Sequence, residues 1–105
     1  MLLQMKGIIR GKDIIISIAP GEHNNYISDE FSNELVIPRT NISETLDFRN
    51  NKEYAISDLQ WNIGDYTSIS QFIVESLWSS NSDLVLGLPW LKTLGTFILN
   101  TEIFF

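Results

Sequence analysis

The sequence predicts an all-β fold in a single small domain spanning residues 1–105. Short apolar runs alternate with turn residues at roughly the eight- to twelve-residue spacing typical of β domains. The apolar runs are rich in β-branched residues, as in Ile14-Ile15-Ile16-Ser17-Ile18, and such residues favour strands. No segment carries the composition of an interdomain linker, because Ser79-Ser80-Asn81-Ser82 is long enough only for a loop.

The N-terminal part predicts a hairpin followed by one helical turn. Gly11-Lys12-Asp13 separates the apolar run from Leu2 to Ile9 from the run from Ile14 to Ile18, so the two runs are expected to pair. Between Ser28 and Leu35, a capping serine precedes acidic first-turn residues. This pattern indicates a short helix that ends before Pro38.

The middle of the chain predicts two hairpins. Leu46 to Tyr54 alternates around a polar tip formed by Asn50, Asn51 and Lys52. Leu59 to Ile63 alternates more regularly before a Gly64-Asp65 turn, and Ile69 to Leu77 is expected to form the return strand.

The C-terminal part predicts a buried strand, a helix and a terminal strand. The strand is Leu84 to Gly87, and the helix runs from Leu88 to Leu94. Pro89 suits the first turn of that helix, and Gly95 suits its end. Phe97 to Phe105 then forms the last expected strand, whose apolar residues need covering.

Composition narrows the function classes. The chain has no cysteine, which excludes disulfides and thiolate metal sites and favours the cytoplasm or nucleus. A lone His23 makes no metal site, and no cofactor is expected. With net charge −6, nucleic-acid binding is not expected. No apolar run approaches the ~20 residues of a membrane span, so we expect a soluble intracellular protein.

One segment resembles a known catalytic loop. The run Ile14 to Ile18, then Ala19-Pro20-Gly21-Glu22 and Asn25-Tyr26-Ile27-Ser28, is similar to the strand, Asp-Ser/Thr-Gly-Ala loop and Phe-Ile-Ser segment of retropepsin-like aspartic proteases of Gypsy-type retrotransposons. In an ungapped match, Ala19 stands at the catalytic Asp position and Pro20 at the Ser/Thr position, while Gly21 is kept.

A second segment strengthens the resemblance, which then covers the chain from about Met5 to Phe105. Residues 82–95 look like the family's Asp-x-Ile-Leu-Gly-x-x-Trp-Leu segment, and the matching core-motif residues are Val85, Leu86, Gly87 and Trp90. The resemblance implies a retropepsin-like acid-protease barrel with one short helix near the C-terminus. It also implies a flap-like hairpin with its tip at Asn50, Asn51 and Lys52. Trp61 and Trp78 are open to either a core or a partner-facing role.

The resemblance implies an activity that this sequence has lost. In the family, two subunits each supply one Asp, and a proton shared by carboxylates about 3 Å apart lets the pair act as base and acid. Ala19 can do neither, and Pro20 has no hydroxyl and no backbone N–H. The flap-like region from Phe48 to Ser57 is shorter than in the family and lacks glycine. We therefore predict a catalytically inactive pseudoenzyme.

The expected role is that of an interaction module. The resemblance implies a homodimer built from the terminal strands, through Leu2, Leu3, Ile98, Ile103, Phe104 and Phe105. An extended peptide or protein segment is the other expected partner, held by strand addition in the cleft bordered by Ala19, Pro20 and Gly21.

The alternative is an aspartic endopeptidase, either active through an unrecognised acid or present as an inactivated form of an active enzyme. Glu22 and Asp13 are the nearest candidate acids, and neither is expected to reach the loop centre. The chain is also open to being a piece of a longer polyprotein.

Overall fold

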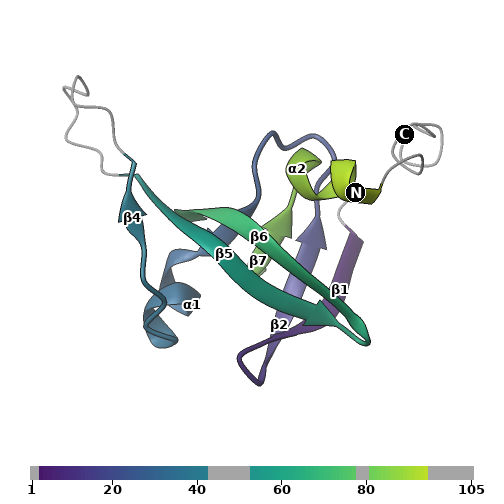
Figure 1. The fold of residues 1–105 in the computed structure, drawn as a ribbon, viewed down its shortest axis with the longest axis horizontal. Helices are drawn as coiled ribbons and strands as arrows, with labels where there is room; N and C mark the ends of the chain where they lie inside the picture. Colours follow the sequence, from purple (N-terminus) through teal and green to yellow (C-terminus); the bar gives the residue numbers. More distant parts are fainter. Residues whose placement is uncertain (1–2, 43–52, 78–80, 95–105) are drawn as a thin grey trace.

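The computed structural model describes residues 3–42, 53–77 and 81–94, and strands dominate them (Figure 1). In chain order the elements are β1 (Leu3–Ile9), β2 (Lys12–Ile18), β3 (Tyr26–Ser28), α1 (Asp29–Glu34), β4 (Thr40–Asn41), β5 (Tyr54–Ile63), β6 (Tyr66–Glu75), β7 (Leu84–Leu86) and α2 (Leu88–Leu91).

The strands form one seven-stranded sheet in the order β1-β2-β7-β3-β6-β5-β4. A further pairing between β1 and β5, at Ile8 and Asn62, brings the sheet back on itself as a barrel. The β2–β7 and β3–β6 pairs are parallel, and the other pairs are antiparallel. The predicted all-β barrel with a short helix near the C-terminus is confirmed.

The β1–β2 hairpin is present, but its turn differs from the prediction. Arg10 and Gly11 alone form the turn, with φ of 51° and 81°, while Lys12 and Asp13 already pair with Ile9 and Ile8. Two consecutive positive φ values match the twist of paired strands. The prediction was wrong about Lys12 and Asp13 because nothing in the sequence marks Arg10 as left-handed.

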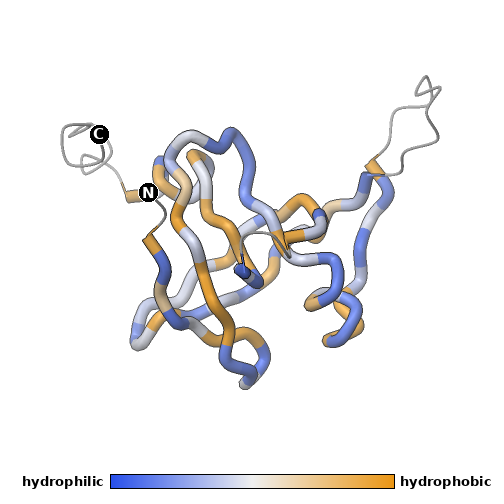
Figure 2. Tube along the Cα trace, turned by 180° about the vertical axis from the view of Figure 1, so that it is seen from behind, coloured by the Kyte–Doolittle hydropathy of each residue, from blue (hydrophilic) through white to orange (hydrophobic). Residues whose placement is uncertain are grey.

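A single main core fills the barrel. Figure 2 shows hydrophobic colour along much of the strands and hydrophilic colour at the β1–β2 turn and in the loop after β2. Trp61, Phe72, Leu84 and Leu86 are fully buried, and Trp90 is 8% exposed. Trp61 is therefore a core residue, whereas Trp78 lies outside the described residues.

Both predicted helices form. The Ser28 hydroxyl caps α1 by accepting the backbone N–H of Phe31 at 3.1 Å. Pro89 lies in the first turn of α2, as expected. The α-helix ends at Leu91 rather than at Leu94, and residues 92–94 continue it as a 3₁₀ turn. Neither helix has the length and apolar character needed to cross a membrane in the described part of the chain.

Of the two predicted middle hairpins, one is described completely and the other only at its base. Gly64 and Asp65 form the β5–β6 turn as predicted, and β6 begins at Tyr66 rather than at Ile69. At the base of the other hairpin, Thr40 pairs with Ala55 and Asn41 with Tyr54. The predicted tip at Asn50, Asn51 and Lys52 lies outside the described residues, as do Gly95 and the expected strand from Phe97 to Phe105.

Candidate functional site

The loop of residues 19–25 connects β2 to β3 and is bonded to the segment around the start of α2. The Ala19 backbone N–H donates to Leu86 O at 2.9 Å, which continues the parallel contact between β2 and β7. Glu22 N–H donates to Ala19 O at 3.0 Å and closes a tight turn. The Glu22 carbonyl then accepts Leu88 N–H at 2.9 Å. The loop is thus held by backbone bonds at both ends of its turn.

Asn25 anchors the far side of the loop. Its side-chain Oδ1 accepts the N–H of Gly87 at 2.9 Å, and its Nδ2 donates to Gln71 O at 3.3 Å. Its backbone carbonyl accepts Ile73 N–H at 2.8 Å. The side chain is 4% exposed, so these partners replace water. Asn25 therefore joins the loop to α2 and to β6.

Gly87 lies against the loop so closely that no side chain fits there. A Cβ at this position would come within 2.4 Å of Asn24 O and 2.6 Å of Glu22 O. Both atoms belong to the backbone, so neither can rotate away. The glycine of the predicted core motif is explained by this close approach.

Ala19 lies in an apolar setting. Its side chain is buried, and it belongs to a small hydrophobic cluster with Leu77 and Val85, against which Tyr26 packs. This cluster is separate from the main core. Position 19 therefore presents a methyl group among aliphatic side chains and one aromatic ring.

The two residues after Ala19 are more exposed. Pro20 is half-buried, and as a proline it offers no backbone N–H at this point. Gly21 is exposed, and a Cβ placed on it would meet no atom within 4 Å. Its φ also lies outside the left-handed region that favours glycine. Within one chain, the geometry therefore gives no reason for glycine at position 21.

The two acids considered as replacements for the catalytic Asp lie at different distances from Ala19. Asp13 is exposed near the start of β2, so six extended residues, roughly 20 Å, separate it from position 19. Glu22 is exposed and follows the tight turn, with its backbone bonded to Ala19 and Leu88. Asp13 is therefore too far along β2 to serve position 19, and the expectation for Glu22 stays a prediction.

Three other polar residues, Asp65, His23 and Asp83, lie at a turn, in the loop or in a contact between strands. Asp65 lies in the β5–β6 turn, and His23 is exposed in the loop. The Oδ2 of Asp83 accepts the N–H of Ile15 on β2 at 2.9 Å. No cluster of metal-ligating side chains is found among the described residues.

The carboxyl group of Glu75 is affected by its burial and by two other carboxylates. Partial burial raises the pKa of Glu75, at the end of β6, and the negative charges of Glu53 and Glu22 raise it further. Glu53 lies just before β5, and Glu75 pairs with Ser28 at the end of β3.

A separate surface pocket of about 370 Å³ is lined by Arg10, Asp58, Leu59, Gln60 and Asn62. It lies along β5 and the β1–β2 turn, and none of its lining residues belongs to the loop of residues 19–25.

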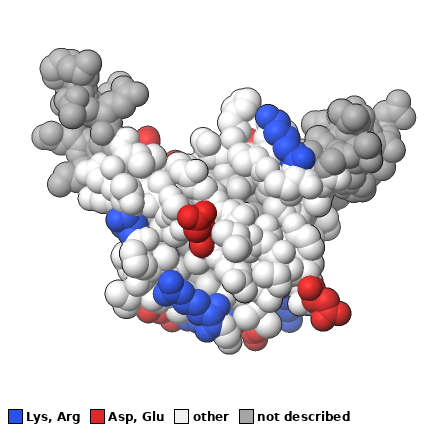
Figure 3. Space-filling view, in the orientation of Figure 1, with Lys and Arg blue, Asp and Glu red and all other residues white. Residues whose placement is uncertain are grey.

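On the face drawn in Figure 3, charged side chains are scattered and no broad basic patch is visible.

The predicted core-motif residues are described in the structure, whereas most of the predicted interface residues are not. Leu3 is described and is 58% exposed on β1, while Leu2, Ile98, Ile103, Phe104 and Phe105 lie outside the described residues. Val85, Leu86 and Trp90 are buried, as the core motif implies. The sequence reasoning did not single out Asn25, Leu77 or Tyr26 as site residues, although Asn25 and Tyr26 lie in the matched loop segment.

Comparison with solved structures identifies the fold. The retroviral protease-like domain of Ddi1 from Leishmania major matches with a TM-score of 0.68 and 15% identity over 89% of this chain and 77% of that chain. A retropepsin-like aspartic protease from Rickettsia conorii matches with a TM-score of 0.60 and 16% identity over 87% of this chain and 70% of that chain. The fold is therefore retropepsin-like.

No family model matches the sequence, and no curated protein matches it significantly. The likeness to known proteins thus rests on the fold and on the short sequence segments described above.

Proposed function

We propose that this chain is a catalytically inactive, retropepsin-like domain of retrotransposon origin that acts as a dimerisation or peptide-binding module. The observation that supports this proposal is the environment of Ala19, whose methyl group packs with Leu77, Val85 and Tyr26. The ungapped match places this residue where the family carries its catalytic Asp.

Peptide hydrolysis by this fold needs an acid–base group at position 19. That group must accept a proton from water and return one to the leaving amine. An alanine methyl group does neither. Pro20 removes a second polar contribution, because a Ser or Thr there would supply a hydroxyl and a backbone N–H. Both losses affect the same loop, so the proposal predicts no residual endopeptidase activity.

Interface formation is the proposed mechanism. Leu3 exposes 58% of its surface on β1, and burying a side chain of this size contributes about 1.5–3 kcal/mol. The sequence supplies further apolar side chains at Leu2, Ile98, Ile103, Phe104 and Phe105. A second copy of the chain can cover these residues together with Leu3, which favours a homodimer.

Peptide binding is the other form that the proposed module can take. Among the described residues, β4 is the last strand of the sheet and pairs only with β5. An extended segment that adds to a sheet edge gains main-chain hydrogen bonds without requiring catalysis. A peptide role therefore needs neither an acid at position 19 nor a second subunit.

Light scattering over a dilution series tests the proposed interface. We expect a dimer mass that falls towards the monomer mass on dilution, and a Leu3→Glu variant that is shifted towards monomer. Ile69→Glu is the matched control, because Ile69 is 62% exposed on β6 and is not among the proposed interface residues. A monomer at every concentration would contradict the dimer mechanism.

Restoring the acid tests why activity is absent. In a chain that has only lost its Asp, Ala19→Asp should recover endopeptidase activity. If the domain has also lost other features of the active site, as we propose, Ala19→Asp should remain inactive. Pro20 is still present in this variant, and the restored carboxylate is surrounded by apolar groups. Cleavage by the single variant would support the alternative, an inactivated form of an active enzyme.

A further inference from the structure

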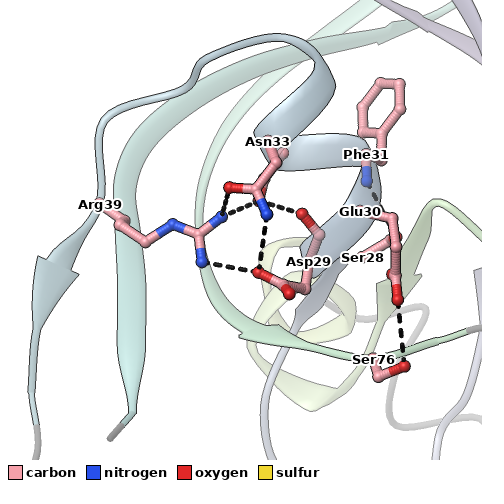
Figure 4. A network of polar contacts seen from close by, with 8 residues as sticks. Ser28, Asp29, Glu30, Phe31, Asn33, Arg39 and Ser76 are labelled. Atoms are coloured by element: carbon pink, nitrogen blue, oxygen red, sulfur yellow. Dashed lines mark hydrogen bonds and ion pairs between the residues drawn. The ribbon is translucent and has the colours of Figure 1, made fainter.

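Arg39 reaches α1 with its guanidinium (Figure 4). The same side chain also contacts Tyr54 on β5. Its Nη1 donates to Asp29 Oδ1 at 2.7 Å, and its Nη2 donates to Asn33 Oδ1 at 2.9 Å and to the hydroxyl of Ser32. The guanidinium group also lies over an aromatic ring, with its carbon 5.6 Å from the centre of the Tyr54 ring. One side chain thus links a helix to β5.

The residues of α1 that accept hydrogen bonds from Arg39 are themselves held in place. Ser32 is fully buried and donates to Asp29 O at 2.9 Å. Asn33 Nδ2 donates to Asp29 Oδ1 at 3.4 Å. The helix is fixed at its start by the Ser28 cap, and Glu30 accepts a hydrogen bond from Ser76 beyond β6. Arg39 therefore binds to an anchored surface rather than to a free helix.

The paired part of the hairpin base is short. β4 has two residues, which pair with Ala55 and Tyr54, and Ile42 N–H donates to Glu53 O at 2.8 Å. Two residue pairs form a marginal strand contact by themselves. The Arg39 side chain, immediately before Thr40, is 20% exposed, so its charged hydrogen bonds are partly shielded from water.

We infer that Arg39 is a positioning residue that clamps the base of the β4–β5 hairpin to α1. The planar guanidinium makes this possible because it presents several donors in one plane and a face to Tyr54 at the same time. A lysine can match the charge but not this arrangement. The inference rests on contacts within one chain and does not depend on the proposed function.

Hydrogen exchange resolved by residue tests the clamp. In Arg39→Lys and Arg39→Ala, we expect the Ile42 amide to exchange about tenfold faster than in the native chain. The amide of Ala19, which donates to Leu86 O, serves as the internal reference and should keep its rate. Arg10→Lys is the matched control, since Arg10 is exposed and makes one long contact of 3.5 Å to Leu35 O at the end of α1.

Two results would overturn the inference. One is an unchanged Ile42 rate in both Arg39 variants. The other is an equal acceleration at Ile42 and Ala19, which would mean that Arg39 stabilises the whole domain instead of positioning the hairpin. If Arg39→Ala fails to fold, Arg39→Lys alone decides, because it preserves the charge and most of the side-chain volume.

Discussion

The side chain of Asn25 accepts the backbone N–H of Gly87 at 2.9 Å, and this bond ties the loop after β2 to the start of α2. The two residues are 62 positions apart. The side-chain amide of Asn25 accepts a hydrogen bond from Gly87. Gly87 has no Cβ and so leaves room for the backbone of the loop. The loop that carries Ala19 is therefore shaped by a contact that has no direct part in any acid–base chemistry.

Loss of the Asn25 side chain is expected to destabilise the domain. Asn25→Ala would leave the buried Gly87 N–H without its partner, which costs about 1–3 kcal/mol. Thermal or denaturant unfolding measures the change. Asn24→Ala is the matched control, because Asn24 is an exposed neighbour in the same loop, and a surface substitution changes stability by only about 0.5 kcal/mol. Equal effects of the two variants would contradict the role of Asn25.

A side chain at position 87 is expected to be harmful. The added methyl group in Gly87→Ala would collide with the carbonyl oxygens of Asn24 and Glu22, at a cost of about 3 kcal/mol or more from overpacking. Gly21→Ala provides the comparison, because a Cβ there meets nothing within 4 Å. The same unfolding measurement should show almost no change for Gly21→Ala. A tolerated Gly87→Ala would mean that the loop is held less tightly than described.

Val36 is expected to be a site where stability can be gained. It follows the end of α1 with φ of 52° and is 81% exposed. Its N–H donates to Asn33 O and that of Ile37 to Ser32 O, which is the helix-ending pattern that usually contains glycine. Val36→Gly should raise stability by about 1 kcal/mol, because it removes the left-handed strain of a β-branched residue.

Calorimetry of Val36→Gly and Val36→Ala measures this gain. We expect the melting temperature to rise by roughly 4–8 °C per kcal/mol gained, with the glycine variant above the alanine variant. A melting temperature below that of the native chain for Val36→Gly would contradict the assignment of strain, because the loss of unfolded-state restriction would then dominate.

Glu75 is expected to make stability fall as pH rises. Its pKa is raised in the folded state by desolvation and by the charges of Glu53 and Glu22, so the folded state holds a proton more tightly than the unfolded state. The associated stability is fully present below the unfolded pKa near 4.5. It is lost as pH increases through the raised folded pKa.

Glu75→Gln should therefore stabilise the domain at pH 7 and have little effect near pH 4. Melting temperatures measured at the two pH values test this difference. Asp65→Asn is a control at an exposed turn position and should not show the same pH-dependent gain. A Glu75→Gln variant that is less stable than the native chain at pH 7 would contradict the electrostatic account.

Much of the fold could be predicted because its strands follow a regular pattern. Leu59 to Ile63 alternates before Gly64-Asp65, and β7 is a short apolar run followed by a proline-containing helix start. The β1–β2 turn was misplaced because Arg10 adopts a left-handed backbone that is uncommon for a residue with a side chain. The hydrogen bond from the Ile15 N–H to Asp83 could not be predicted, because sequence distance does not reveal that β2 lies beside β7.

The candidate site could be predicted only in part. The short motif match located the loop at Ala19, and Gly87 was identified through its own motif. The neighbours of Ala19 come from separate elements, with Val85 on β7 and Leu77 after β6. The pairing of these strands brings them together, so single-sequence patterns could not show that position 19 is both buried and apolar.

Catalytic inactivity is tested most directly by an endopeptidase assay on the native chain from pH 4 to pH 7, with and without a pepstatin-type inhibitor. We expect no cleavage above background at any pH, because a methyl group at position 19 can neither accept nor donate a proton. Cleavage that the inhibitor abolishes would disprove the inactivity and show that another acid serves the site.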